Sequence, residues 1–352
     1  MTGDIISQLG GRHTLEKALT DNLKWIIKSF AHNKNLGSSG WSNILGQFSR
    51  PYPETTGYLI PTLIASSQYL ADISYLSIAK NQINFFSSIT NKNGSYYQSI
   101  GNKKPIVFDT SQILLGLCKL YEHEPDPNVA DQITINLKWL LSVINKEGRF
   151  TNNNFTEQNC PAYYSRVFWA MLLASKICGN NQHAAISAGI DYIIEQRNSN
   201  NSFSQWGFDN EAFVLTHNIV YTLRGLYETA LITDNDALLS IVENCIDTVV
   251  STLISDNKLY GAYNQQWKAD RSFVCSVGNA QFAYLMLTIN SEKYSKAITI
   301  VLQPILRMQS KIGPNKGAVQ SSLPIWGKYQ RWKYTNWTQK FFCDALITLL
   351  NQ

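Results

Sequence analysis

The sequence repeats one unit, a pair of amphipathic helices, six times along its 352 residues. Apolar residues recur with helical period in a first set of segments: 15–30, 70–88, 128–144, 182–197, 236–254 and 292–309. A second set alternates with the first and begins near Glu54, Asp109, Tyr164, Thr216, Gly278 and Asn336, so that successive starts lie 55, 55, 52, 62 and 58 residues apart. Such regular spacing predicts a repeat fold whose units share one core.

The two sets differ in polarity, and this difference predicts where each set lies. Segments of the second set, such as "RVFWAMLLASKI", are apolar nearly all round, which is typical of buried helices. Segments of the first set carry Lys, Glu and Asp on one face and are expected outside. We therefore predict an all-α fold, an (α/α)6 toroid of six outer and six inner helices, with residues 1–352 forming a single domain.

The connections between the helices place the expected site. Links from an outer to an inner helix are long and rich in Gly, Asn and aromatic residues, whereas links from an inner to an outer helix are short. Because the inner helices would run parallel, their N-termini and all the long loops would share one mouth. Long loops on a rigid scaffold usually carry function, so we expect the site at this mouth.

Composition narrows the classes of function. Lys and Arg exceed Asp and Glu by 30 − 25 = 5, and no dense basic run is present, which disfavours a nucleic-acid partner. The N-terminus has no signal-peptide pattern, and no window approaches the ~20 apolar residues of a membrane span. The six cysteines are scattered without paired spacing. We expect a reduced cytoplasmic protein with no integral membrane segment, disulfide, metal or cofactor.

The starts of the inner helices share polar and aromatic residues at positions three apart, which lie on one helix face. From this pattern the candidate catalytic residues are Glu54, Asp109, Arg166, His217 and Tyr221. The candidate substrate-binding residues are Tyr52, Tyr58, Gln112, Tyr164, Trp169, Asn218, Trp267, Asn279, Gln281, Trp326, Trp337 and Lys340. Six positive helix ends converging on one basin favour an anionic ligand, and a polar and aromatic basin favours a saccharide.

Structural explanations compete with these functional ones. Asp109 and Gln112 also match a capping box. Glu54, in the first turn of its helix, also suits the helix dipole. His217 is equally consistent with a core histidine, and each tryptophan with packing at the centre of the toroid. Arg166 is harder to explain structurally, because a guanidinium at the start of an inner helix needs an anionic partner, either from the protein or from a ligand.

The segments "YPETTGYLIPT", "FDTSQILLGL", "YYSRVFWAMLLA", "LTHNIVYTLRGL" and "SLPIWGKY…NWTQKFF" resemble bacterial six-hairpin (α/α)6 toroid proteins of surface-polysaccharide gene clusters, often described as prenyltransferase/squalene-oxidase repeat-like. The resemblance covers about Trp41 to Phe342 and implies a fold and a pathway more than a reaction. The chain departs from the terpenoid cyclases in lacking the acidic motifs DxDD and DDxxD.

Three classes of function follow. The first is an enzyme of cell-surface polysaccharide metabolism that acts on a saccharide, acidic in our expectation, or on a lipid-linked saccharide. Hydrolysis would use a carboxyl pair, for which Glu54 and Asp109 are the natural candidates. A lyase or epimerase would instead draw on Tyr221, His217, Arg166 and Asn218. The second class is a non-catalytic glycan-binding protein, and the third is a terpenoid or prenyl-chain cyclase-like enzyme.

Overall fold

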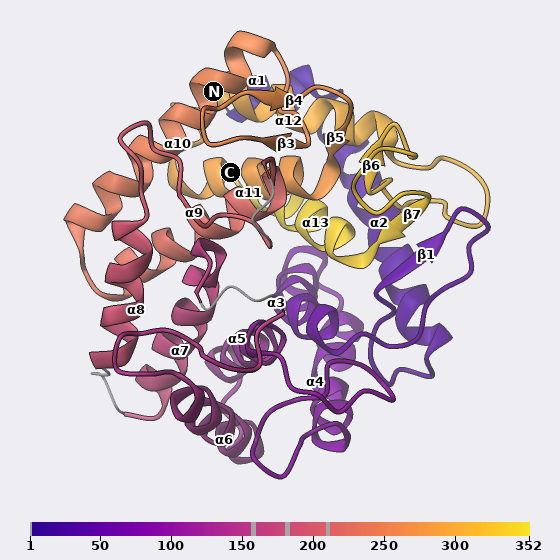
Figure 1. Cartoon of the computed structure of the whole chain (residues 1–352). Helices are drawn as coiled ribbons and strands as arrows, with labels where there is room; N and C mark the ends of the chain where they lie inside the picture. Colours follow the sequence, from indigo (N-terminus) through magenta and orange to yellow (C-terminus); the bar gives the residue numbers. More distant parts are fainter. Residues whose placement is uncertain (1, 156–159, 180–183, 209–211) are drawn as a thin grey trace.

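Two concentric sets of helices make up most of the computed structural model, which describes residues 2–155, 160–179, 184–208 and 212–352 (Figure 1). The outer helices are α2 (Arg12–His32), α4 (Ile73–Ser88), α6 (Pro127–Val143), α8 (Ala184–Glu195), α10 (Asp236–Asp256) and α12 (Ser295–Met308). The inner helices are α3 (Pro53–Leu70), α5 (Val107–His123), α7 (Ser165–Ile177), α9 (Thr216–Ile232), α11 (Ser276–Asn290) and α13 (Asn336–Leu350).

The inner helices close into a ring. Each packs against the next in chain order, and the last, α13, packs against α3 and also against the first outer helix, α2. The predicted (α/α)6 toroid is therefore confirmed. The predicted helix starts lie within three residues of the observed ones, although residues 182–183 of the fourth outer segment lie outside the described residues. A short helix that the sequence analysis did not predict, α1 (Thr2–Gln8), precedes the ring.

Short strands join the long loops at the mouth. β1 (Trp41–Asn43) pairs antiparallel with β7 (Lys333–Thr335), which ties the first long loop to the last. β2 (Val214–Leu215), β3 (Ala262–Tyr263) and β4 (Ala269–Asp270) form a three-stranded sheet, and β5 (Val274–Cys275) pairs with β6 (Ser322–Leu323). A 3₁₀ turn at Ala162–Tyr164 leads into α7. The rim of the mouth is thus held by pairing between neighbouring loops.

Two glycines set the close approach of α3 and α5. A Cβ atom on Gly116 would lie 2.4 Å from the carbonyl oxygen of Gly57, and a Cβ on Gly57 would lie 2.6 Å from the Cα of Ile113. Gly225 on α9 is equally close to the start of α7 at Ser165. The glycines of the "LGL" and "RGL" segments therefore lie inside helices, at points where the inner helices meet backbone to backbone.

One helix in the described part of the chain, α10, is long and apolar enough to cross a membrane by length and composition. It lies in the outer ring, where it packs against the inner helix α9 and the outer helix α12.

We predict that Gly116→Ala destabilises the fold by about 1–3 kcal/mol, because the added methyl group has no room between two backbones. Urea denaturation measures the free energy of unfolding. Gly3→Ala is the matched control, since nothing lies within 4 Å of a Cβ at that position. Equal stability of the two variants would contradict the close contact.

Candidate active site

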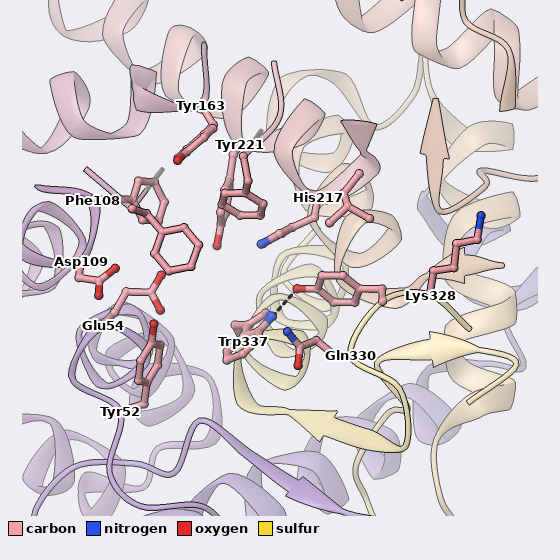
Figure 2. A pocket seen from close by; sticks show the side chains of 14 residues that line it. Tyr52, Glu54, Phe108, Asp109, Tyr163, His217, Tyr221, Lys328, Gln330 and Trp337 are labelled. Atoms are coloured by element: carbon pink, nitrogen blue, oxygen red, sulfur yellow. Dashed lines mark hydrogen bonds between the residues drawn. The ribbon is translucent and has the colours of Figure 1, made fainter. Parts of the chain in front are cut away.

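The starts of the inner helices surround a pocket of about 360 Å³ at the mouth of the toroid (Figure 2). Six of the predicted site residues line it: Tyr52, Glu54, Asp109, His217, Tyr221 and Trp337. The pocket lies where the sequence analysis placed the site, at the N-terminal ends of α3, α5 and α9 and under the long loops.

A carboxyl pair lies on one wall of this pocket. Glu54 is the second residue of α3 and Asp109 the third of α5, and Figure 2 shows their side chains turned toward the same space. Both residues are buried, with 8% and 4% of their surface exposed. The Oδ2 atom of Asp109 has no hydrogen-bond partner among the described residues, whereas Glu54 Oε2 accepts a hydrogen bond from Thr55 Oγ1 at 3.5 Å.

This environment raises the pKa of both carboxyls. Burial raises the pKa of Glu54 to about 7, against the opposing effects of the Tyr58 hydrogen bond and the positive charge of Arg166. Burial also raises the pKa of Asp109 well above its ordinary value, and the nearby charge of Glu54 raises it further. For two carboxyls that both resist ionisation, a state in which one keeps its proton is favoured over the doubly ionised state.

The capping explanation for Asp109 does not hold. The N-cap of α5 is Ile106, which makes no side-chain capping bond, and Asp109 lies inside the first turn. The Gln112 side chain donates to Ser111 Oγ and accepts from Arg166 Nε, so it does not complete a capping box. The carboxyl of Asp109 therefore does not cap α5.

His217 is held as a neutral hydrogen-bonding group facing the pocket. Burial lowers the pKa of its imidazole to about 3, and the positive charge of Arg166 lowers it as well. Gln281 Nε2 lies 3.1 Å from His217 Nδ1, and as a donor it leaves the proton on Nε2 of the ring. Gln281 itself does not line the pocket.

Three aromatic rings form a partition below the mouth pocket. Tyr58, Tyr221 and Phe341 come from α3, α9 and α13, and each ring centroid lies 6.1–6.2 Å from the other two. The Tyr221 hydroxyl donates to the Tyr58 hydroxyl at 2.7 Å. Tyr221 lines the mouth pocket, whereas Tyr58 and Phe341 line a second cavity farther along the axis.

The expectation of one shared basin is therefore wrong for several residues. Arg166, Gln112, Trp169 and Lys340 line the second cavity, with Tyr58. The reason is the reach of the side chains: Arg166 extends under the ring of Tyr221, where its Nε donates to Gln112 Oε1 at 3.0 Å. Helical spacing fixes the face on which a residue lies, but it does not fix the depth at which a long side chain ends.

Five other candidates lie away from both cavities. Tyr164 is buried and donates its hydroxyl to Asn154, and Asn279 donates to the carbonyl oxygens of Leu259 and Cys275. Asn218 is fully buried and lines neither cavity. The remaining two are tryptophans of the outer loops: Trp267 donates to the Asn200 carbonyl, and Trp326 is 60% exposed.

Sequence reasoning missed part of the lining. Phe108 and Tyr163 add aromatic surface, and Lys328, Tyr329 and Gln330 enter from the loop before β7. Trp337 Nε1 donates to the Tyr329 hydroxyl at 2.7 Å, which fixes this loop over the helix starts (Figure 2). The only available signal was the "GKYQRW" segment itself, since its approach to the pocket depends on pairing between distant strands.

No cluster of three or more His, Cys, Asp or Glu side chains that could hold a metal ion occurs within the described ranges. The six cysteines are free thiols.

No family model and no curated protein matches the sequence. Solved structures are similar, among them an unsaturated glucuronyl hydrolase specific for heparin (TM-score 0.77, 13% identity, covering 97% of this chain and 98% of that one). A cellobiose 2-epimerase from Bacillus thermoamylovorans gives a TM-score of 0.77 at 13% identity, over 95% and 97%. An Asp-to-Asn mutant of the Streptococcus agalactiae unsaturated glucuronyl hydrolase, complexed with dGlcA-GalNAc6S, gives 0.66 at 12%, over 95% and 90%. These likenesses establish the fold.

We predict that the free energy of unfolding of Glu54→Gln, relative to that of the unmodified protein, is higher at pH 8 than at pH 5 by on the order of 2 kcal/mol. The pKa of Glu54 is about 7 in the folded chain against an ordinary value of 4.5. The native state therefore binds more protons than the unfolded state between these values, and stability falls as the pH rises through this window. Urea denaturation of both proteins at the two pH values measures the change.

Asp131→Asn, which replaces an exposed carboxylate on α6, is the matched control and should show no such difference. A stability difference between Glu54→Gln and the unmodified chain that is the same at pH 5 and pH 8 would contradict the raised pKa.

Proposed function

We propose that the chain is a carbohydrate-active enzyme that cleaves a glycosidic bond by proton transfer at Glu54 and Asp109. The observation that carries this proposal is the pair of buried carboxyls with raised pKa values on one wall of an aromatic-lined pocket. Glycoside hydrolysis needs one carboxyl protonated and the other ionised, which is the state that such a pair adopts near neutral pH.

The surroundings of the two carboxyls suggest which one holds the proton. Glu54 has three groups that favour its ionised form: the Tyr58 hydroxyl, the charge of Arg166 and the Thr55 hydroxyl. Asp109 has no such partner, and its Oδ2 is without a hydrogen bond among the described residues. Asp109 would therefore protonate the leaving oxygen as general acid. Glu54 would act as the base toward water or as the nucleophile.

The rest of the pocket suits a sugar. The rings of Tyr52, Phe108 and Trp337 offer faces for the apolar side of a pyranose, and the neutral His217 imidazole offers a hydrogen bond to a hydroxyl. The folds of a glucuronyl hydrolase and a cellobiose epimerase, both of which act on saccharides, support this class.

The proposal that the substrate is acidic is supported by the glucuronyl hydrolase neighbours more than by the charge of the pocket lining. Among the described lining residues the one lysine or arginine is Lys328, whose Nζ lies 2.6 Å from the Asp270 carboxylate. Arg166, which a lyase would need to neutralise a substrate carboxylate, lines the other cavity. We therefore favour hydrolysis over elimination. A place in surface-polysaccharide metabolism, a lipid-linked substrate and a cytoplasmic location remain expectations from the sequence.

Epimerisation is the second candidate, because His217 projects into the pocket and a cellobiose 2-epimerase shares the fold. A pKa of about 3 makes His217 a weak base, which places this reaction behind hydrolysis. A glycan-binding role without catalysis would use the same pocket. A terpenoid or prenyl-chain cyclase-like activity has no support from the sequence motifs of that class, since DxDD and DDxxD are absent.

We predict that Asp109→Asn lowers kcat/KM by about 100-fold or more on a cleaved oligosaccharide, because the amide cannot donate the proton, and that saccharide affinity stays within a few-fold. Mass spectrometry of products from unsaturated glucuronyl oligosaccharides and neutral β-linked oligosaccharides measures turnover. Glu54→Gln should behave alike, and Asp131→Asn should keep full activity. Cleavage that persists in both pocket variants would exclude the carboxyl-pair mechanism, whereas binding without product in every protein would favour the glycan-binding role.

We also predict that kcat/KM is low at pH 5 and rises toward neutrality. Below about pH 7 Glu54 becomes protonated and can no longer act as base or nucleophile. Activity should fall again at higher pH, where Asp109 loses the proton that it donates. A profile measured from pH 4.5 to 9 on the cleaved substrate tests this, and full activity at pH 5 would refute it.

A further inference from the structure

A second cavity of about 210 Å³ lies on the axis of the toroid, on the far side of the aromatic partition. Its lining includes residues from later turns of the inner helices, for example Lys119 on α5, Arg224 on α9 and Thr348 on α13. At about 30 Å³ for each water it has room for roughly seven waters or one compact ligand. The proposed reaction in the mouth pocket makes no use of this space.

Most charged groups of this lower cavity are already paired. Arg224 forms an ion pair with Glu228, Lys340 with Asp344, and Lys119 with Glu122 outside the cavity. These pairs leave no net charge.

Arg166 is the exception. Only 3% of the surface of Arg166 is exposed, and its side chain lines the cavity. Among the described residues, no carboxylate lies within ion-pair distance of its guanidinium. Its one hydrogen bond within that part of the chain runs from Nε to Gln112 Oε1. The terminal nitrogens are left to the cavity, while the rings of Tyr58, Tyr221 and Trp169 surround the guanidinium at 4.7–5.4 Å.

A buried guanidinium without an ion-pair partner is costly, because its charge has lost contact with water and no carboxylate lies close enough to replace it. The aromatic faces offset part of this cost by cation–π attraction, but they leave the terminal donors unused. A planar guanidinium with free donors matches the oxygens of a carboxylate or of a tetrahedral oxyanion.

We infer that the lower cavity is a binding site for a small oxyanion, a carboxylate or a phosphate-like group, held by Arg166 and separate from the saccharide pocket. One negative charge neutralises the unpaired guanidinium, and a volume of about 210 Å³ suits a small ligand. The inference stands on the cavity and its charge, and it does not depend on the proposed reaction.

The site is coupled to the mouth pocket through Glu54. The positive charge of Arg166 lowers the pKa of Glu54, so an anion on Arg166 cancels part of that effect and holds the proton on Glu54 more tightly. By reciprocity, ionisation of Glu54 weakens anion binding. The other titratable or charged groups that interact with Glu54 are Tyr52, Tyr58, Asp109, Tyr221 and Tyr329.

Isothermal titration with sulfate and with acetate, in chloride-free buffer at pH 6, tests the site. We expect saturable binding of one anion per chain, and the two probes distinguish a tetrahedral oxyanion from a carboxylate as the preferred ligand. Arg166→Met should weaken the affinity by about 10-fold or more, as expected for loss of a charge-assisted hydrogen bond. Absence of binding to the unmodified chain would overturn the proposal.

Two further variants exclude trivial explanations. Gln112→Glu keeps the shape of the side chain and places a carboxylate beside Arg166 Nε, so it should occupy the guanidinium and abolish binding without loss of fold. Lys328→Met removes the lysine of the mouth pocket and should leave the affinity within about twofold. Loss of binding in Lys328→Met, with retention in Arg166→Met, would place the anion in the mouth pocket and refute the lower site.

The coupling has its own readout. Sulfate does not titrate between pH 6 and 8, so a fall in its affinity over this range reports the ionisation of protein groups, of which Glu54 has a pKa of about 7. In Glu54→Gln the fall should shrink several-fold. An identical pH dependence in the unmodified chain and in Glu54→Gln would overturn the coupling. These measurements need no substrate, so their failure leaves the proposed hydrolysis untouched, and an inactive enzyme leaves the anion site untouched.

Discussion

The parallel closure of the inner ring is the constraint on which the rest of the structure depends. Because α13 returns to pack on α3, six helices are fixed side by side with their N-termini at one end. Aligned helix dipoles make that end positive and favour negative charge there. Yet Glu54 and Asp109 both keep raised pKa values, so burial and mutual repulsion outweigh the helix ends. The toroid thus places two carboxyls at helix ends that favour their ionised forms, but it also buries them, and burial disfavours ionisation more strongly.

The sequence predicted the ring because its signal is local and repeated. Helical periodicity is carried within each segment, and the boundaries of α9 and α13 were placed correctly at Thr216 and Asn336. The same logic placed Glu54, Asp109 and His217 at the mouth, since a residue in the first turn of an inner helix has little choice of depth.

Other parts of the site depend on information that no single segment carries. Arg166 lies in a first turn as well, but its long side chain follows the attraction of three rings and one amide into the lower cavity. Tyr329 reaches the pocket through its contact with Trp337 and through loops joined by β5 and β6, which lie about fifty residues apart. Side-chain reach and non-local pairing are the two physical reasons for the differences.

The pairing of β1 with β7 has a consequence for how the molecule comes apart. In an open solenoid the terminal repeats have a single neighbour and fray first, so unfolding proceeds from the ends. Here the first and last long loops share a ladder, and α2 and α3 pack on α13, so no repeat is terminal. Detaching any one hairpin breaks two interfaces at once and opens the central axis to water. The chain is therefore built to unfold as one cooperative body, and a truncation at either end removes a wall shared by both cavities.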